Sequence, residues 1–512
     1  MISALFLWLS VAGLALLAAS ALAVRSYTRF AKRARGAESR CLPRSGPQTV
    51  LDRLVEDAMA AHPGQNGLAN LLDPRDAFAA RSLSAFAAGR SLDLIYYIWK
   101  TDTSGWLLMA DLLAAADRGV RVRLLLDDVN VQGFDLAFLG LNQHPNIEVR
   151  LFNPVRNRGH WVRRSLEFAL GLSRFNRRMH GKVWIADGCL AILGGRNVGD
   201  TYFGAPGSGA RMAQDADMLV AGGIVTQAEQ VFDSFWNLGL SLPILTLWPS
   251  FRLNERRFRR RLLRHSASPL ATAYRMQAVA GRGPADLLVT PLRWTEEVTL
   301  LSDPPDKALG QRRGPWLLDS IADLLRGAES EIRLTTPYFV PGTPGLTLLT
   351  DLAQQGRRVQ VLTNSLASTD LFSVHAAYSH YRRPLLAAGA ELFEFAPPAR
   401  RLRRRDFLHS KIFLIDRSRA LVGSHNFDMR SAYINIELGL LFREPDLVAE
   451  LWALFDRQTD PACAFSVTLE DGLLHWNIVE DGRKGRERYE PEASLPRRAA
   501  SWIIARLPHD WF

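Results

Sequence analysis

Hydrophobic positions between residues 76 and 128 switch twice between a helical and a strand period. Apolar residues recur at helical spacing over 76–91 and 105–118. The segments LDLIYYIW at 92–99 and VRVRLLLDD at 120–128 have the length and the leucine, isoleucine and valine content of strands. This order predicts a helix followed by a β-α-β unit.

The same order returns in the second half of the chain. The predicted elements there are a helix at 315–328, a strand at 331–340, a helix at 346–356 and a strand at 358–363. Gly119 and Gly356 occupy equivalent turns from helix to strand. The recurrence indicates an internal duplication, and such units normally build a largely parallel sheet covered by helices on both faces. We therefore expect an α/β protein with two similar lobes, each built on a mixed, largely parallel sheet flanked by helices.

Each half also contains an apolar strand, a polar turn and a second apolar strand. These segments are VWIADGCLAILGG at 183–195 and IFLIDRSRALVGS at 412–424. A His-x-Lys triplet opens each of them, at 180–182 and 409–411. Since side chains alternate along a strand, the histidine and the lysine of each triplet are expected on one face, pointing into a common pocket.

The N-terminal residues 2–24 carry no charge and are long enough to cross a bilayer as a helix. Five basic residues follow between Arg25 and Arg35. The positive-inside rule then predicts an anchor with a short outside N-terminus and a cytoplasmic body, and we expect this anchor to be retained. A cleaved signal peptide is the alternative, because Ala21-Leu22-Ala23 resembles a cleavage site, but no basic segment precedes the apolar stretch.

With 512 residues and 47% hydrophobic content, the chain can bury the cores of two or three domains. A net charge of +11 and a pI near 9.9 indicate an anionic partner, either nucleic acid or a phospholipid surface. Three scattered cysteines, Cys41, Cys189 and Cys463, fit neither a disulfide framework nor a zinc site. Two arginine clusters, at 256–264 and 400–405, are interpreted equally well as solvated surfaces or as contacts to anionic lipid headgroups.

The two His-x-Lys triplets begin longer motifs that match position by position. The first is His180-x-Lys182-x4-Asp187 followed by Gly194-Gly195-Arg196-Asn197, and the second is His409-x-Lys411-x4-Asp416 followed by Gly423-Ser424-His425-Asn426. Only six of the 63 basic residues are lysines, and two of these six stand in the motifs. Two full copies at matched spacing indicate one active site assembled across the two lobes.

The residue types in these motifs favour phosphoryl chemistry. A histidine can attack phosphorus or donate a proton. The ammonium groups of Lys182 and Lys411 and the amides of Asn197 and Asn426 can bind phosphate oxygens. Metal binding by the two histidines is the rival interpretation, but an ammonium group cannot ligate a cation and repels it. We expect neither a metal nor another cofactor.

Each histidine needs a partner that fixes its tautomer and orientation. Glu437 in INIELGLLF and Asp215 in AQDADMLVAG occupy matching positions in the two halves, with Asp217 as the alternative in the first half. Asp187 and Asp416 belong to the catalytic motif but stand beside turns, which favours a local structural role over proton transfer.

These motifs resemble those of the phospholipase D superfamily. The segments at 177–203 and 408–439, together with YYIWKTDTSG, LLAAADRGVRVRLLLDD and TTPYFVPG, are similar to bacterial cardiolipin synthases, most of all their C-type branch. The resemblance runs from near residue 60 to the C-terminus. It implies a monomeric protein whose two lobes are related by a pseudo-twofold axis, with one active site between them. It also implies that one histidine, by family precedent His180, becomes a phosphatidyl-histidine while His409 acts as acid and base.

The activity implied by the resemblance is that of a phosphatidyltransferase bound to the inner (cytoplasmic) membrane. It would make cardiolipin from phosphatidylglycerol and a second phosphatidyl donor, phosphatidylglycerol or phosphatidylethanolamine. One alternative is hydrolysis of the same lipids, as in a phospholipase D. Another is a phosphodiesterase or nuclease using the same histidines, although the N-terminal segment and the lack of a nucleic-acid module argue against it. A degenerate scaffold would have lost one motif, and both are intact. The expected partners are phospholipids and the membrane, without nucleic acid. Whether a helper protein takes part is left open by the sequence.

The patterns divide the chain into six segments. They are a transmembrane helix at 2–24, a juxtamembrane linker at 25–66, a first lobe at 67–240, an inter-lobe basic segment at 241–310, a second lobe at 311–470 and a C-terminal extension at 471–512. Since each lobe carries one motif, the active site is expected where the lobes meet.

Overall fold

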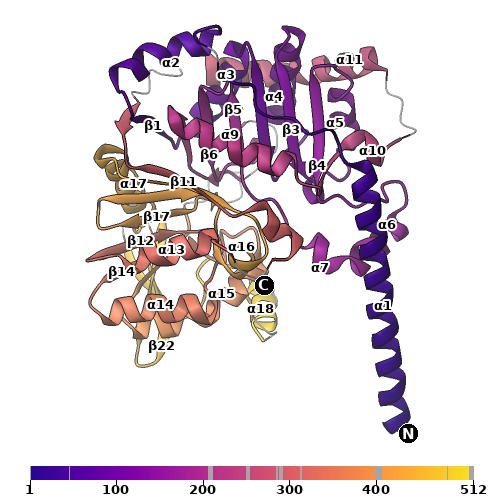
Figure 1. The fold of residues 1–512 in the computed structure, drawn as a ribbon. Helices are drawn as coiled ribbons and strands as arrows, with labels where there is room; N and C mark the ends of the chain where they lie inside the picture. Colours follow the sequence, from indigo (N-terminus) through magenta and orange to yellow (C-terminus); the bar gives the residue numbers. More distant parts are fainter. Residues whose placement is uncertain are drawn as a thin grey trace.

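Two β-sheets form the centres of two lobes, one above the other in Figure 1. The structure, a computed structural model, describes residues 2–44, 46–205, 211–249, 254–283, 286, 292–311, 314–397, 406–480 and 483–506. The first sheet contains β1 (Asn66–Leu71), β2 (Ser91–Tyr96), β3 (Arg121–Asp127), β4 (Ile147–Phe152), β5 (Val183–Ala186), β6 (Leu190–Gly194), β8 (Asp217–Ala221), β9 (Ser241–Pro243) and β10 (Arg293–Thr295). The second contains β11 (Val298–Ser302), β12 (Glu331–Thr335), β14 (Arg358–Asn364), β15 (Glu391–Phe395), β17 (Ile412–Ile415), β18 (Arg419–Gly423), β20 (Leu438–Phe442), β21 (Ala464–Glu470), β22 (Leu473–Glu480) and β23 (Arg483–Glu487).

The two sheets have matching strand orders, and both are mixed. The first order is β10-β1-β8-β6-β5-β2-β3-β4-β9, and the second is β11-β20-β18-β17-β12-β14-β15-β21-β22-β23. Parallel pairing is confined to β2-β3-β4 in one sheet and β12-β14-β15 in the other. The expected mixture of parallel and antiparallel pairs is therefore confirmed, but the expectation that parallel pairs dominate is wrong. The reason is that short turns join β5 to β6 and β17 to β18, and a short turn can connect only antiparallel neighbours.

Helices cover the outer face of each sheet. Those of the first lobe are α2 (Val50–Ala61), α3 (Pro74–Ala87), α4 (Thr103–Asp117), α5 (Asp135–Leu141), α10 (Ile244–Leu247), α11 (Glu255–Ser266) and α12 (Pro269–Val279), which share one hydrophobic core with the sheet. Those of the second lobe are α13 (Leu317–Arg326), α14 (Gly342–Gln354) and α15 (Phe372–Ala387). The predicted helix and strand order is thus confirmed in both halves, except that the strand expected at 331–340 splits into β12 and β13 (Phe339–Val340).

A shared core joins the inner faces of the two sheets. It contains alternate residues of β5 and β17, such as Val183, Ile185, Ile412 and Leu414, because successive strand side chains point to opposite faces. Two helices, α9 (Gly223–Trp236) and α17 (Pro445–Gln458), add their apolar sides to the same core. The lobes are therefore fixed relative to each other by apolar burial.

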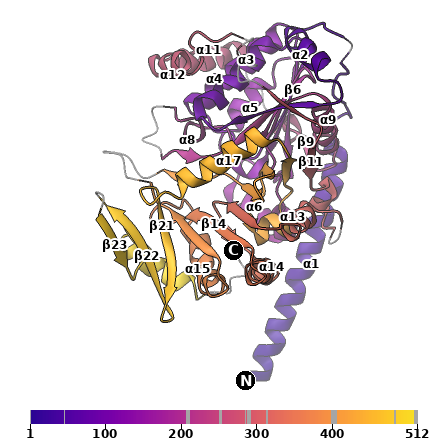
Figure 2. The ribbon, with the colours of Figure 1, turned by 90° about the vertical axis from the view of Figure 1, so that its left-hand side faces the viewer.

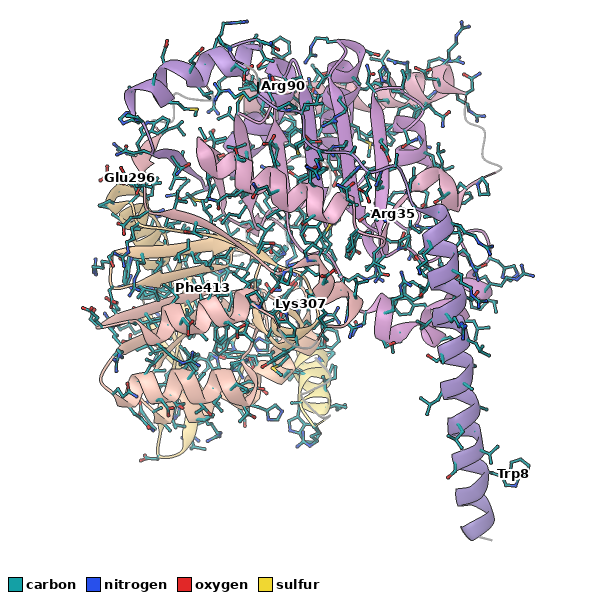
Figure 3. All side chains as sticks on the ribbon, viewed as in Figure 1. Trp8, Arg35, Arg90, Glu296, Lys307 and Phe413 are labelled. Atoms are coloured by element: carbon teal, nitrogen blue, oxygen red, sulfur yellow. The ribbon has the colours of Figure 1, made fainter. Side chains whose placement is uncertain are left out.

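The N-terminal helix α1 (Ile2–Ala34) is longer than the predicted transmembrane segment. Its first half projects from the body, with Trp8 pointing away from the protein (Figures 1 and 3). The second half packs on the first lobe through Tyr27, Ala31 and Ala34, which are buried against Phe175 and its neighbours. Residues 25–34, expected to begin a linker, thus continue the helix, and α2 lies within the remainder of the expected linker.

The segments expected between and after the lobes belong to the two sheets. Within 241–310, β9 and β10 pair with strands of the first sheet, and β11 pairs with β20 of the second. After residue 470, β22 and β23 extend the second sheet at the edge far from α1 in Figure 2. The last helix, α18 (Leu495–Ile504), packs beside α15.

Candidate active site

Each His-x-Lys triplet pairs with a backbone segment of the other lobe. His180 N donates to Ile436 O at 2.9 Å, and Met179 forms a parallel bridge with Ile436. In the second copy, His409 N donates to Gln214 O at 2.7 Å. The short strands β16 (Phe407–Leu408) and β7 (Ala213–Gln214) pair in parallel just before this contact. The triplets therefore lie just before β5 and β17, where the lobes meet, and not on the strands as expected.

Strand register places the two candidate orienting carboxylates at equivalent positions. Gly194 of β6 lies opposite Asp217 of β8, and Gly423 of β18 lies opposite Gly439 of β20. Asp215 and Glu437 each precede these partners by two residues, immediately before β8 and β20. Both carboxylates therefore reach the lobe interface beside the triplets.

The histidine and carboxylate pairs cross between the lobes. His180 Nδ1 lies 2.8 Å from Glu437 Oε2, and His409 Nδ1 lies 2.5 Å from Asp215 Oδ2. The alternative carboxylate, Asp217, instead forms buried ion pairs with Arg81 and Arg196. All four paired side chains are buried. Each imidazole is thus oriented through Nδ1, which leaves Nε2 as the nitrogen for chemistry.

Burial keeps both imidazoles neutral in the absence of a bound anion. Desolvation lowers the pKa of His180 to about 4 and also lowers the pKa of His409, although the neighbouring carboxylates oppose this. Burial alone would raise the pKa of Glu437, but the His180 contact outweighs it and the pKa falls to about 2. Because an ionised carboxylate only accepts hydrogen bonds, Nδ1 of each imidazole carries the proton and Nε2 presents its lone pair. A neutral imidazole in this tautomer is a nucleophile.

The two motif lysines are buried beside the histidines. Lys182 Nζ donates to His180 O, and Lys411 Nζ donates to His409 O and lies 3.1 Å from His409 Nδ1. Desolvation lowers the pKa of Lys182 to about 7 and also lowers the pKa of Lys411. Because Lys411 also repels the Lys182 ammonium, a phosphate anion bound beside these two groups is favourable.

The motif asparagines lie beside the triplets. Asn197 Oδ1 accepts from Ile98 N at 3.2 Å, which leaves Nδ2 buried with no well-oriented acceptor in the described part of the chain. Asn426 is also buried, and its backbone N–H donates to Ser431 Oγ at 3.3 Å. The Asn197 amide, whose oxygen is held by Ile98 N, can therefore donate its N–H₂ to a phosphate oxygen.

The motif aspartates stabilise local backbone. Asp187, at φ +55°, accepts hydrogen bonds from the backbone N–H groups of residues 89, 90 and 91, directly before β2. Asp416, at φ +51°, does the same for residues 329, 330 and 331 before β12. Their carboxylates are therefore occupied at the hairpin turns and contact neither histidine.

The sequence interpretation missed a group of residues that holds Glu437. The carboxylate oxygens of Glu437 accept hydrogen bonds from Ser424 Oγ at 2.5 Å and from Ser431 Oγ at 2.8 Å. Behind it, Asp303 Oδ2 accepts from Glu437 N at 3.0 Å and from Lys307 Nζ at 2.8 Å. The rarity of lysine in this chain was the available signal, because Lys307 is another of the six.

The two halves of the site differ beside their orienting carboxylates. Ser424 occupies the place that Gly195 has in the first lobe, since both donate their N–H groups across matching strands. A Cβ on Gly195 would lie 2.3 Å from Asp215 Oδ1. The aspartate half-site therefore has no room for a side chain, whereas the glutamate half-site uses the serine hydroxyl as a donor.

Two further clusters of side chains lie apart from His180 and His409. The first arginine cluster forms much of α11, which packs on α4 at the end of the molecule opposite the projecting half of α1 (Figures 1 and 2), and Arg259 pairs with Asp117 and Glu255. The second arginine cluster lies outside the described residues. Among those described, His375, Glu394 and Glu490 are grouped as metal ligands could be, but Arg382 contacts all three and its cation takes the place of a metal.

Comparisons with known proteins match most of the chain. The family described as "Cardiolipin synthase, PLD-like domain" matches residues 86–236 and 321–459. Cardiolipin synthase C of Escherichia coli K12 is 35% identical over 475 residues, covering 88% of this chain and 97% of that protein. Cardiolipin synthase 1 of Bacillus anthracis is 26% identical over 71% of this chain and 60% of that protein. In fold, the chain is similar to phosphatidylserine synthase of Haemophilus influenzae, with a TM-score of 0.57 and 13% identity over 89% of this chain and 97% of that one.

Proposed function

Because the chain belongs to the cardiolipin synthase family with phospholipase D-like domains, we propose that it is a membrane-bound phosphatidyltransferase that makes cardiolipin. The observation that carries the proposal is the pair of imidazoles, each oriented by a carboxylate of the other lobe, beside two buried lysines. Two nitrogen groups in matching environments suit a reaction in which one alcohol leaves a phosphate and a second alcohol replaces it.

In the first step, His180 Nε2 attacks the phosphorus of a phosphatidyl donor. A P–N bond forms, the P–O bond to the headgroup breaks, and the departing oxygen takes a proton from His409 Nε2. Lys182 and Lys411 hold the phosphate oxygens, on which negative charge is spread in the transition state. The amides of Asn197 and Asn426 donate to the same oxygens.

The charges of the site support this division of labour. With both lysines protonated and Asp215 and Glu437 ionised, two positive and two negative charges cancel. A bound phosphodiester adds one negative charge, which raises the pKa of the imidazoles and is balanced by protonation of one of them. The protonated imidazole is then the acid that the departing alcohol needs.

In the second step, a hydroxyl of phosphatidylglycerol displaces the histidine. His409 Nε2, now neutral, takes the proton of this hydroxyl while its oxygen bonds to phosphorus and the P–N bond breaks. Burial of both histidines supports transfer over hydrolysis, because water has poor access to the phosphatidyl-histidine.

The anchor places the enzyme at the lipid surface. The segment Ser10–Ala34 of α1 is long and apolar enough to cross a membrane. The basic residues that follow the apolar stretch support an inner-membrane location with the lobes in the cytoplasm. Retention is supported by the helix itself, which runs unbroken through Ala21-Leu22-Ala23 to the part packed on the first lobe. Both half-sites come from one chain, which supports a monomeric catalytic unit.

Lipid mass spectrometry tests the activity. Full-length protein is reconstituted in liposomes of phosphatidylglycerol and phosphatidylethanolamine, each carrying a different isotope label in its headgroup. Cardiolipin should form and a labelled free alcohol should be released, and the label of that alcohol identifies the donor. His180→Ala is the matched control and should form neither. Accumulation of phosphatidic acid without cardiolipin would make the protein a phospholipase D.

A trapping experiment tests the order of the histidines. A donor with p-nitrophenol as its headgroup needs no acid, because this alcohol leaves readily. With His409→Ala, the phosphatidyl group should therefore remain on the peptide that contains His180, where mass spectrometry detects it. An adduct on His409 in the His180→Ala protein would reverse the assignment.

A further inference from the structure

Helix α6 (Trp161–Leu170) lies on the surface of the first lobe without a buried residue. One side of the helix faces outward: Trp161 is 72% exposed and Leu166 58% exposed, and Val162 and, in α7 (Leu172–Phe175), Leu172 are also exposed. On the other side, Phe168 packs against Phe175. A cluster of exposed large apolar residues on a short helix is costly in water and marks a contact surface.

The position of α6 is set by its contact with α1. Ser20 Oγ donates to Leu170 O at 2.5 Å, so the end of α6 lies beside Ser20. Figure 1 shows α6 and α7 beside α1 where this helix leaves the body. Ser20 belongs to the uncharged stretch and precedes Arg25 by five residues, which is about 7.5 Å along a helix. If α1 spans the bilayer, α6 is held at the depth where headgroups meet the acyl chains.

We propose that α6 and the start of α7 form a second membrane contact, an interfacial helix that inserts its apolar side into the leaflet that α1 enters. This inference rests on the proposed membrane anchorage. A bilayer is the occupant that fits, because the Ser20 contact holds α6 beside the uncharged, exposed stretch of α1 that the proposed anchorage places in the membrane. Its composition also fits, since Trp161 is a typical interfacial residue and Arg163 and Arg164 beside it can reach anionic headgroups.

A short segment of the chain connects the proposed membrane contact to the active site. From α7, the chain runs through Asn176 and Arg178 to His180 within five residues. Arg430 of the second lobe donates to Asn176 Oδ1 at 2.7 Å, so both lobes hold this connection. The interfacial helix thus orients the lobe interface toward the leaflet, and a phospholipid reaches the histidines without leaving the membrane surface.

Site-specific photocrosslinking tests the proposal in the full-length protein in liposomes. p-Benzoylphenylalanine replaces Leu166 in one sample and Leu263 in the other. Leu263 is a matched control, because it is 64% exposed on α11 at the far end of the molecule. After irradiation, mass spectrometry should find a phospholipid adduct at position 166 with a yield about tenfold above that at position 263. Equal yields, or no adduct at position 166, would overturn the proposal.

A second variant measures the consequence. Val162→Asp with Leu166→Asp should lower cardiolipin formation in liposomes about tenfold while leaving the rate in detergent micelles within about twofold, because micelles present lipid without a fixed plane. Leu263→Asp should change neither rate. Unchanged activity of the double variant in liposomes would contradict the proposal. Crosslinking does not depend on turnover, so an adduct at position 166 in a protein that makes no cardiolipin would reject the proposed function alone.

Discussion

His180 and Glu437 are 257 residues apart in the chain and belong to different lobes, yet their side chains meet at 2.8 Å. The reciprocal pair, His409 and Asp215, is separated by 194 residues and meets at 2.5 Å. Neither lobe therefore contains a complete histidine and carboxylate pair. Separation of the lobes would misorient both imidazoles together.

This exchange predicts that Glu437→Gln resembles a His180 variant and that Asp215→Asn resembles a His409 variant. Both should lower cardiolipin formation about a hundredfold or more, because an amide can hold the wrong imidazole tautomer. With the p-nitrophenol donor, the first burst of p-nitrophenol should persist in Asp215→Asn and disappear in Glu437→Gln. A burst that survives in both variants would contradict the crossed pairing.

Gly195 and Ser424 offer a matched exchange. In Gly195→Ala the new Cβ would lie 2.3 Å from Asp215 Oδ1 and push this carboxylate away from His409, so we expect a loss of activity of about a hundredfold. Ser424→Gly removes one hydrogen bond to Glu437 and leaves those from Ser431 and His180, so it should cost about 1–1.5 kcal/mol, or roughly five- to twelvefold in rate. Rate measurements on the two variants check the order of the effects, and a larger loss in Ser424→Gly would refute this account.

Asp187→Ala should reduce stability more than catalysis. It removes the acceptor of three backbone N–H groups, and a hydrogen bond to a charged group contributes about 1.5–3 kcal/mol. Asp187→Asn should be milder, since asparagine tolerates the positive φ and keeps one acceptor oxygen. Thermal unfolding and activity per folded molecule separate the two effects. If Asp187→Ala folds normally and loses turnover, the aspartate takes part in the chemistry.

Lys307→Met should weaken both the fold and the site. It leaves the buried carboxylate of Asp303 without its cation, and breaking a buried ion pair costs about 3–5 kcal/mol. Because Asp303 also holds the backbone of Glu437, kcat should fall along with the unfolding temperature. Replacing both members, with Asp303→Asn and Lys307→Met, should recover part of the stability. No recovery in the double variant would show that the pair does not act as a unit.

The value of kcat/KM should fall as the pH rises, because the imidazole that must gain a proton on binding has a lowered pKa in the free protein. The fall should steepen above about pH 7, because Lys182 loses its charge as the pH rises through its lowered pKa of about 7. On the acid side, His180 remains a neutral nucleophile down to its pKa of about 4. Lys182→Arg retains its charge, so the steep fall in kcat/KM should move to a higher pH. The rate of this variant should be lower than that of the unchanged protein, because arginine differs in shape from lysine. Lys484→Arg, at an exposed position, is the control and should leave the profile unchanged.

Local pattern was enough to predict much of the fold. The helical and strand periods around 76–128 and 315–363 correspond to α3-β2-α4-β3 and α13-β12-α14-β14, because apolar periodicity records which face of an element is buried. Apolar periodicity did not predict how β5 and β17 pair with their neighbours. Their hairpins make most of each sheet antiparallel, which depends on how strands are ordered in space.

The sequence by itself determined most chemical groups of the site, since the duplicated motifs name both histidines, both lysines and both asparagines. The matching strands that follow the motifs add two equivalent carboxylates, with Asp217 as an alternative to the first. Only the tertiary structure decided which carboxylate orients which histidine, and it also brought in Asp303 and Lys307 behind Glu437. The physical reason is that side-chain pairing acts over distances near 3 Å in space. The order of residues along the chain fixes the residue types and the hydrophobic period of each element. The packing of one lobe on the other creates these short distances.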